Sequence, residues 1–118
     1  MGRHHARILS DLEGVDLIGI VDPGVKHHER MLYADLDSLL ASGVDYCVVA
    51  IPTYQHEEVG LRLAGAGVHA LIEKPLAQDG ASAVRLVEAF ELAGLIGAVG
   101  HIERFNPALQ QARRRMAN

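Results

Sequence analysis

The sequence has one cysteine, no tryptophan and no long apolar run. Cys47 has no second cysteine with which to pair, so an internal disulfide is excluded, in keeping with a reducing compartment. No apolar stretch approaches the ~18 residues that a membrane-spanning helix requires. Residues 1–15 carry charges and histidines in place of the apolar core of a signal peptide. We therefore expect a cytoplasmic protein without a membrane partner.

Positive charge is also scarce, because 11 basic residues face 15 acidic ones and the net charge is −4. A chain with this balance has no overall field that attracts nucleic acid. The run Arg113-Arg114-Arg115 is the exception, and we interpret it as a solvated helix face.

Histidine is abundant, with seven residues, but the pattern does not predict a metal site. Two pairs, His4-His5 and His27-His28, are adjacent in sequence, so their side chains point apart in regular structure. No cysteine or carboxylate cluster completes a ligand set. We expect no bound metal.

Short apolar segments alternate with helical patterns along the 118 residues, a length that fits one domain, residues 1–118. Four segments are almost continuously apolar, as parallel strands covered on both faces should be: 16–22, 45–52, 68–74 and 96–101. Apolar residues at three- and four-residue spacing between them predict helices near 6–12, 36–40, 59–64 and 83–90. This order predicts an α/β fold, a doubly wound parallel sheet of the Rossmann type with helices on both sides.

Glycines and capping residues mark the ends of these elements. Gly43, Gly67 and Gly94 each follow a helical pattern, where a left-handed residue ends a helix. Asp79 with Ser82 predicts the start of a helix near residue 80, and Asn106-Pro107 predicts the start of another. We expect residues 22–34 to form a loop that contains at most a short edge strand.

Polar residues gather where the predicted strands end. Asp22, residues 52–56, Glu73-Lys74 and His101 all occupy such positions. In open parallel sheets, ligands bind beyond the carboxyl ends of the strands. The sequence therefore predicts a ligand crevice at this edge.

Each candidate residue has a plainer interpretation beside the functional one. An acid in the position of Asp22 binds adenosine ribose hydroxyls, yet Asp-Pro after a strand is also ordinary turn chemistry. Lys74 is able to hold a substrate hydroxyl, or simply to pair with Glu73 at the surface, and Pro75 fixes the direction of the chain there. Gly2 is either the last glycine of a dinucleotide-binding turn or an ordinary second residue.

Histidine and arginine side chains add further candidates near the same edge. His56 and His101 are able to transfer protons near neutral pH, and Arg104 is able to clamp a phosphate or carboxylate. The sequence contains no Walker loop, no G-x-S-x-G elbow and no setting for a nucleophilic cysteine.

Taken together, six stretches resemble the N-terminal, nucleotide-binding domain of the Gfo/Idh/MocA oxidoreductases. They are MGRHHARIL (1–9), VDP (21–23), YADLDSLL (33–40), VVAIPTYQHEEV (48–59), AGVHALIEKPLA (66–77) and VGHIERFNPA (99–108). They cover almost the whole chain in the family's order, and EKP is the most specific of them. The last stretch resembles members that oxidise UDP-N-acetylhexosamines at C3 of the sugar.

The resemblance implies a role for each matching residue. Gly2 would lie at the pyrophosphate and Asp22 at the adenosine ribose, which favours NAD over NADP. Pro52, Thr53 and His56 would line the nicotinamide side, and Glu73 would position that region. Lys74 would act in catalysis, touching the substrate hydroxyl and the nicotinamide ribose. His101 and Arg104 would contact a sugar or nucleotide-sugar substrate, and the reaction would be hydride transfer to or from nicotinamide.

Three departures from the family pattern shape what we expect of this chain. The family's first strand and leading Gly-x-Gly are absent, and the stretch between Pro23 and Tyr33 is shorter than usual. The C-terminal substrate domain, which carries the usual catalytic histidine, is also missing. Because the first strand is central in the order 3-2-1-4-5-6, its loss leaves two open sheet edges. We expect a truncated Rossmann domain that is inactive alone and that associates into a homo-oligomer.

We interpret the chain as part of a dehydrogenase that acts on a sugar or nucleotide sugar. Three alternatives remain open: part of an inositol or other polyol dehydrogenase, a non-catalytic nucleotide-binding protein, or a truncated domain that associates with itself. The presence of Lys74 favours an enzyme, whereas the missing glycines favour a protein without turnover.

Overall fold

A three-stranded parallel sheet forms the centre of the computed structural model, which describes residues 1–26 and 31–117. The strands are β1 (Tyr46–Val49), β2 (His69–Ile72) and β3 (Gly97–Val99), in the order β1-β2-β3. Their last residues are in register, because Val49 pairs with Ile72 and Ile72 with Val99. The carboxyl ends of all three strands therefore lie at one edge of the sheet.

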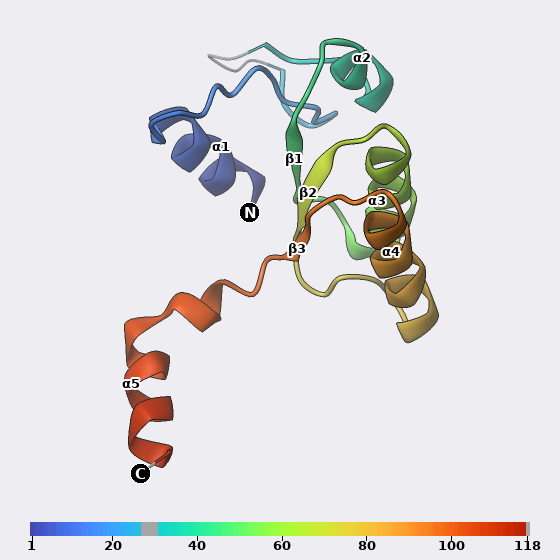
Figure 1. The fold of residues 1–118 in the computed structure, drawn as a ribbon. Coiled ribbons are helices and arrows are strands. Elements are labelled where there is room, and N and C mark those ends of the chain that lie inside the picture. Colours follow the sequence, from blue (N-terminus) through green and yellow to red (C-terminus); the bar gives the residue numbers. More distant parts are fainter. Residues whose placement is uncertain (27–30, 118) are drawn as a thin grey trace.

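The described residues form five α-helices beside the sheet: α1 (Gly2–Asp11), α2 (Leu36–Ala41), α3 (His56–Gly65), α4 (Gly80–Leu92) and α5 (Pro107–Met116). They also form the 3₁₀ helices η1 (Thr53–Gln55) and η2 (Ile102–Phe105), which follow β1 and β3. Helices α3 and α4 pack side by side against one face of the sheet, and α1 lies on the opposite side (Figure 1). This arrangement confirms the predicted α/β class, as a partial Rossmann fold.

The core lies between the sheet and the pair α3 and α4. Strand residues alternate between the two faces, so Ala70 and Ile72 of β2 point toward these helices and are buried. Leu63 of α3 and Leu86 of α4 meet them and are almost fully inaccessible. Burying a leucine side chain contributes about 1.5–3 kcal/mol, so this layer holds the helices to the sheet.

The helix ends follow the sequence predictions. The Ser82 amide donates to the Asp79 carboxylate at 2.8 Å where α4 begins, and the Ala108 amide donates to Asn106 Oδ1 at 3.0 Å where α5 begins. Left-handed glycines follow α2, α3 and α4, with φ values of 80°, 76° and 65° at Gly43, Gly67 and Gly94. Glycine adopts this conformation without steric cost, which is why the chain turns at these residues.

The predicted strand at 16–22 is wrong. In residues 1–26 and 31–117 the segment forms a single bridge, in which the Ile20 amide donates to the Met31 carbonyl and the Tyr33 amide donates to the Ile20 carbonyl. Within the described residues this segment does not pair with a partner strand beyond the bridge, so no ladder of backbone hydrogen bonds forms. The predicted loop at 22–34 is otherwise free of helix and strand where it is described, and residues 27–30 lie outside the described residues.

The C-terminal segment extends away from the sheet. Helix α5 packs on η2, contains no buried residue, and projects from the body of the protein (Figure 1). Within residues 1–26 and 31–117, no helix has both the length and the apolar character needed to cross a membrane.

Candidate functional site

Three segments converge at the carboxyl edge of the sheet. Residues 50–55 follow β1, residues 73–75 follow β2, and residues 100 and 101 follow β3. The convergence follows from the parallel pairing and shared register of the strands. The sequence predicted that four strand ends meet here, and the structure confirms this for the three strands of the sheet, whereas the described segment before Asp22 forms no strand.

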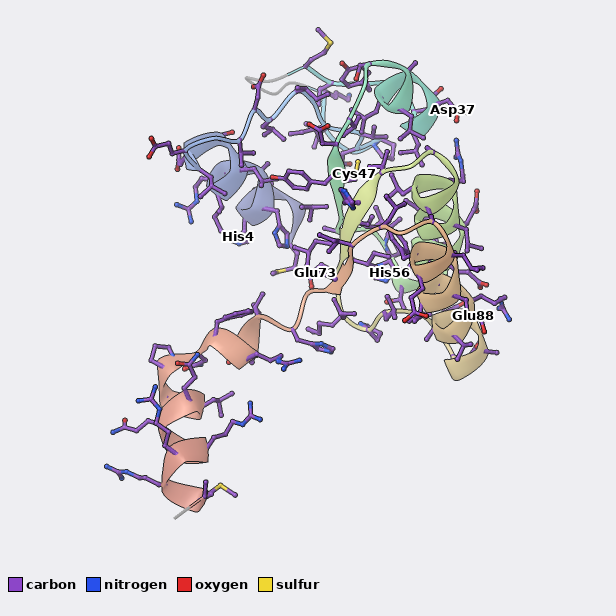
Figure 2. All side chains as sticks on the ribbon, in the orientation of Figure 1. His4, Asp37, Cys47, His56, Glu73 and Glu88 are labelled. Carbon is purple, nitrogen blue, oxygen red and sulfur yellow. The ribbon has the colours of Figure 1, made fainter. Side chains whose placement is uncertain are left out.

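Glu73 is the buried charge at this edge, with a relative exposure of 6%. It lies at the strand ends, between α1 and α3 (Figure 2). Its Oε1 atom accepts a hydrogen bond from His5 Nε2 at 2.7 Å, and its Oε2 atom accepts from the Lys74 amide at 3.2 Å. The bond from His5, and to a smaller extent that from Lys74, holds the pKa of the Glu73 carboxyl below its ordinary value, although burial opposes this.

Gly100 brings a third segment against the same carboxylate. A Cβ atom added at Gly100 would lie 3.1 Å from Oε2 and 3.3 Å from the Cα atom of Glu73. The Gly100 amide also donates to the Ile72 carbonyl at 2.8 Å. A glycine therefore lets the turn after β3 pack directly on Glu73.

Lys74 follows Glu73 and is exposed. None of the ion pairs among the described residues includes its ammonium group. The peptide bond between Lys74 and Pro75 is cis. Lys74 therefore directly follows a buried, hydrogen-bonded residue, Glu73, so its backbone is held in place while its side chain is exposed.

His56, a predicted cofactor residue, is buried with a relative exposure of 1%. Its Nδ1 atom is 3.0 Å from the Pro75 carbonyl oxygen, and its Nε2 atom is 3.0 Å from the Ile51 carbonyl oxygen. The ring therefore ties the segment after β1 to the segment after β2. In this position it holds the backbones at Ile51 and Pro75 together at the edge of the sheet.

Pro52 and Thr53 lie between these contacts, in the turn that leads from β1 into η1. Pro52 is exposed, and its carbonyl oxygen accepts from the Gln55 amide at 2.9 Å. Thr53 is half-buried. His56 contacts the carbonyl oxygens of Ile51, just before this turn, and of Pro75, just after Lys74, and so links the two segments.

Gly2 lies near this edge as well. A Cβ atom added at Gly2 would lie 4.0 Å from Ala50 Cβ, so the start of α1 adjoins the end of β1. No side chain caps this helix start, and its first turn contains no acidic residue. Uncapped amides at a helix N-terminus are suited to bind an anionic group.

Asp22 is exposed and serves its own turn. Its Oδ1 atom accepts from the Gly24 amide at 2.8 Å, the plainer of the two interpretations of this Asp-Pro sequence. An ionised carboxylate accepts several hydrogen bonds, so Asp22 retains capacity for a ligand. Among the described hydrogen bonds and ion pairs, none joins Asp22 to Glu73 or Lys74.

His101 and Arg104 belong to the segment that leaves the sheet, and both are exposed. His101 directly follows the end of β3 at the converging edge. Arg104 instead lines an open hollow of about 290 Å³ between η2 and α5, together with Glu103, Leu109, Ala112, Arg113 and Met116. Lys74 is not among the residues that line this hollow.

The sequence analysis missed His5 as a functional candidate. Its acidic partner is 68 residues away, and the His4-His5 pair was assessed only as a metal ligand. The described residues contain no group of three or more histidine, cysteine or acidic side chains that is able to hold a metal. Burial raises the pKa of the Cys47 thiol, which favours the neutral form.

Comparison with known proteins shows the family to which this fold belongs. Residues 1–101 match the family described as "Oxidoreductase family, NAD-binding Rossmann fold", which is the Gfo/Idh/MocA family. Inositol 2-dehydrogenase 4 from Saccharopolyspora erythraea is 34% identical over 125 residues, an alignment that covers 97% of this chain and 37% of the relative.

Solved structures that are similar to this chain in fold and sequence include two dehydrogenases. UDP-N-acetylglucosamine 3-dehydrogenase GnnA from Acidithiobacillus ferrooxidans has a TM-score of 0.86 at 32% identity, covering 97% of this chain and 38% of that protein. The WlbA dehydrogenase from Bordetella pertussis, solved in complex with NADH and UDP-GlcNAcA, has a TM-score of 0.86 at 25% identity, covering 98% and 36%.

The chain spans well under half the length of these relatives, 37% in the case of the inositol dehydrogenase. The match nevertheless covers the sheet, helices α1 to α4 and the converging strand ends, which form the dinucleotide-binding part of such proteins. The protein belongs to the Gfo/Idh/MocA family of NAD-binding oxidoreductases.

Proposed function

We propose that this chain is the cofactor-binding part of a dehydrogenase that uses NAD and transfers a hydride to or from a hydroxyl-bearing carbon of a sugar or nucleotide sugar. The observation that carries the proposal is the position of Lys74 at the edge where three strand ends converge, next to the buried Glu73. Similarity to UDP-N-acetylglucosamine 3-dehydrogenase GnnA supports the substrate class.

Groups at this edge and at Asp22 would each bind a different part of the cofactor. The uncapped start of α1 at Gly2 offers amide donors for a pyrophosphate, and Asp22 offers carboxylate oxygens for ribose hydroxyls. A carboxylate at the ribose disfavours a 2′-phosphate, so NAD is preferred over NADP. Pro52 and Thr53 would form the wall on the nicotinamide side, held in place by His56.

Bound nicotinamide supplies the hydride acceptor or donor of the reaction. Lys74 would hold the substrate hydroxyl and move its proton as the carbon is oxidised or reduced. Glu73 would act through the backbone of Lys74, whose amide donates a hydrogen bond to the Glu73 carboxylate. His101, beside the end of β3, and Arg104 would contact the substrate from the segment that leads into α5.

The first test of this proposal is cofactor binding. NADH added to the 118-residue chain should bind more tightly than NADPH, as measured by calorimetry. Asp22→Ala should weaken NADH binding and reduce the preference, whereas Asp16→Ala, at the other end of the same segment, should change neither. An Asp22→Ala chain that binds both cofactors like the parent would remove Asp22 from the site.

The second test is turnover, measured on a polypeptide that joins this chain to a substrate domain like that of its longer relatives. Lys74→Ala should abolish most NADH formation while cofactor affinity stays nearly constant, and Lys26→Ala, the only other lysine change that the chain offers, should leave both unchanged. An unchanged rate in Lys74→Ala would exclude its catalytic role.

A polyol substrate is the second candidate, favoured by the 34% identity to an inositol 2-dehydrogenase. A panel containing UDP-N-acetylglucosamine and myo-inositol would separate the two, because the preferred substrate should give the higher kcat/KM. A chain that binds NADH while its extended form turns over neither compound would support the non-catalytic alternative.

A further inference from the structure

The contact between His5 and Glu73 joins two parts of the chain that are far apart in sequence. His5 lies one turn into α1, and Glu73 directly follows β2. The Nε2 atom of His5 and the Oε1 atom of Glu73 are 2.7 Å apart, and their side chains are 16% and 7% exposed. This is a short hydrogen bond to a largely buried carboxylate.

Loss of such a hydrogen bond should have a large effect on the buried carboxylate. Hydrogen bonds to charged groups contribute more than neutral ones, and a buried carboxylate left without its partner is costly. The other described ion pairs, Arg62–Asp37 and Arg85–Glu57, are formed by more exposed side chains at the protein surface. Among the described ion pairs, the one with His5 is the only one that involves the carboxylate of Glu73, which directly precedes Lys74.

The two oxygens of Glu73 divide their partners. Oε1 accepts from His5, which leaves Oε2 to accept from the Lys74 amide. Gly100 packs against the same carboxyl group, so the carboxylate has little room to rotate. The carboxylate that accepts from the Lys74 amide is therefore itself held by a side chain of α1.

We propose that His5 is a positioning residue of the dinucleotide site. By holding Glu73 it fixes the start of α1, where the pyrophosphate would bind, relative to the turn that carries Lys74. The inference rests on the proposed function for its meaning in catalysis, but the link itself is a property of the fold. His5 contacts neither cofactor nor substrate in this proposal and acts through Glu73.

The neighbouring histidine offers a matched control. His4 lies on the same helix, is exposed, and has no side-chain hydrogen bond among the described residues, so His4→Ala changes the same residue type at a site that does not reach Glu73. His5→Ala removes the bond. His5→Gln keeps an amide donor of similar reach and serves as the conservative variant.

The experiment compares the four chains by NMR and by NADH titration, at a temperature where each gives the dispersed spectrum of a folded protein. In His5→Ala, the amide signals of Lys74 and Gly100 should shift, and the Glu73 carboxyl should titrate at higher pH than in the parent. NADH should bind more weakly, by roughly tenfold, because the start of α1 and the turn at Lys74 would then have to be ordered against each other when the cofactor binds. His5→Gln should recover most of each change, and His4→Ala should match the parent.

The outcomes separate this inference from the proposed function. A parent chain that does not bind NADH would count against the cofactor role of this chain, while the NMR signals of Lys74 and Gly100 would still decide the link. If His5→Ala left those signals, the Glu73 titration and any NADH affinity at parental values, the positioning role would be overturned. A loss of stability alone, with none of these readouts moved, would overturn it equally.

Discussion

The Nδ1 atom of His56 lies 3.0 Å from the carbonyl oxygen of Pro75, and this contact joins the first residue of α3 to the turn that follows Lys74. On the other side of the ring, Nε2 faces the Ile51 carbonyl at the same distance. A neutral imidazole has one N–H and donates to one of these carbonyls, whereas the protonated ring donates to both. In either state, the ring fills the space between two strand ends.

Replacing His56 with alanine should therefore destabilise the protein strongly. The change removes the contacts to both carbonyls and leaves a cavity at a position that is 1% exposed. We expect a loss of about 2–4 kcal/mol in the free energy of unfolding, measured by urea denaturation. The exposed His101→Ala should change it by less than about 0.5 kcal/mol. Equal midpoints for the two variants would contradict the role assigned to His56.

The stability contributed by Glu73 should depend on pH. Because its pKa is lowered in the folded protein, chiefly by the hydrogen bond from His5, its contribution is complete above the ordinary pKa of a glutamate. It is lost as the pH falls through the lowered value, where the carboxyl is protonated in both folded and unfolded chains.

Glu73→Gln should accordingly cost about 2 kcal/mol at neutral pH, and the difference from the parent should shrink as the solution is acidified. Unfolding curves collected over a pH series would measure this. Glu88→Gln, on the exposed side of α4 (Figure 2), is the control and should stay close to the parent at every pH. A difference for Glu73→Gln that grew on acidification would reverse the assigned direction of the pKa shift.

Substitution by alanine of two glycines in α3 should change the stability of the protein in opposite directions. A Cβ atom at Gly60 would lie 2.5 Å from Leu86 Cδ2 and 3.1 Å from Ile72 Cδ1, both in the core, so Gly60→Ala should destabilise the protein by about 1–3 kcal/mol. A Cβ atom at Gly65 meets nothing within 4 Å, and Gly65→Ala should stabilise the helix by up to about 1 kcal/mol. Thermal unfolding of both variants tests the packing of α3 on α4, and a stabilising Gly60→Ala would contradict it.

The sequence predicted the elements whose signals are local. The left-handed glycines at 43, 67 and 94, and the caps at Asp79 and Asn106, depend on residues a few positions apart, and each lies where it was predicted. The apolar runs around β1, β2 and β3 were identified because strands buried on a sheet leave a continuous pattern. The convergence of residues 52–53, 73–74 and 101 followed from parallel pairing alone.

What the sequence did not predict depends on distant partners. The apolar run at 16–22 has the composition of a strand, but a strand needs a neighbour, and in the described part of the chain the one bridge of this run joins Ile20 to Leu32. The burial of His56 depends on a carbonyl 19 residues away, and the bond from His5 on an acid 68 residues away. A histidine in a sequence does not reveal whether its ring faces a ligand or the backbone of another turn.

The exposed apolar side chains of the C-terminal segment make self-association the last prediction. Ile102, Phe105, Leu109 and Met116 are all exposed on η2 and α5, with Phe105 at 78%, and clustered apolar exposure favours burial against another surface. A second copy of this chain is the partner that the charges favour. Residues 101–118 hold four arginines and one acid, whereas residues 1–100 hold seven basic and fourteen acidic residues. A basic segment and an acidic body attract each other between copies.

Light scattering should therefore give a molar mass that rises with protein concentration, and added salt should lower it by screening the attraction. Phe105→Ser combined with Leu109→Ser should shift the protein toward the monomer. Leu92→Ser is the matched control, because Leu92 is 89% exposed but lies on α4, away from this segment, and its loss should leave the mass unchanged. A parent chain that stays monomeric over the whole concentration range, or a Leu92→Ser chain that dissociates like the double variant, would contradict association through η2 and α5.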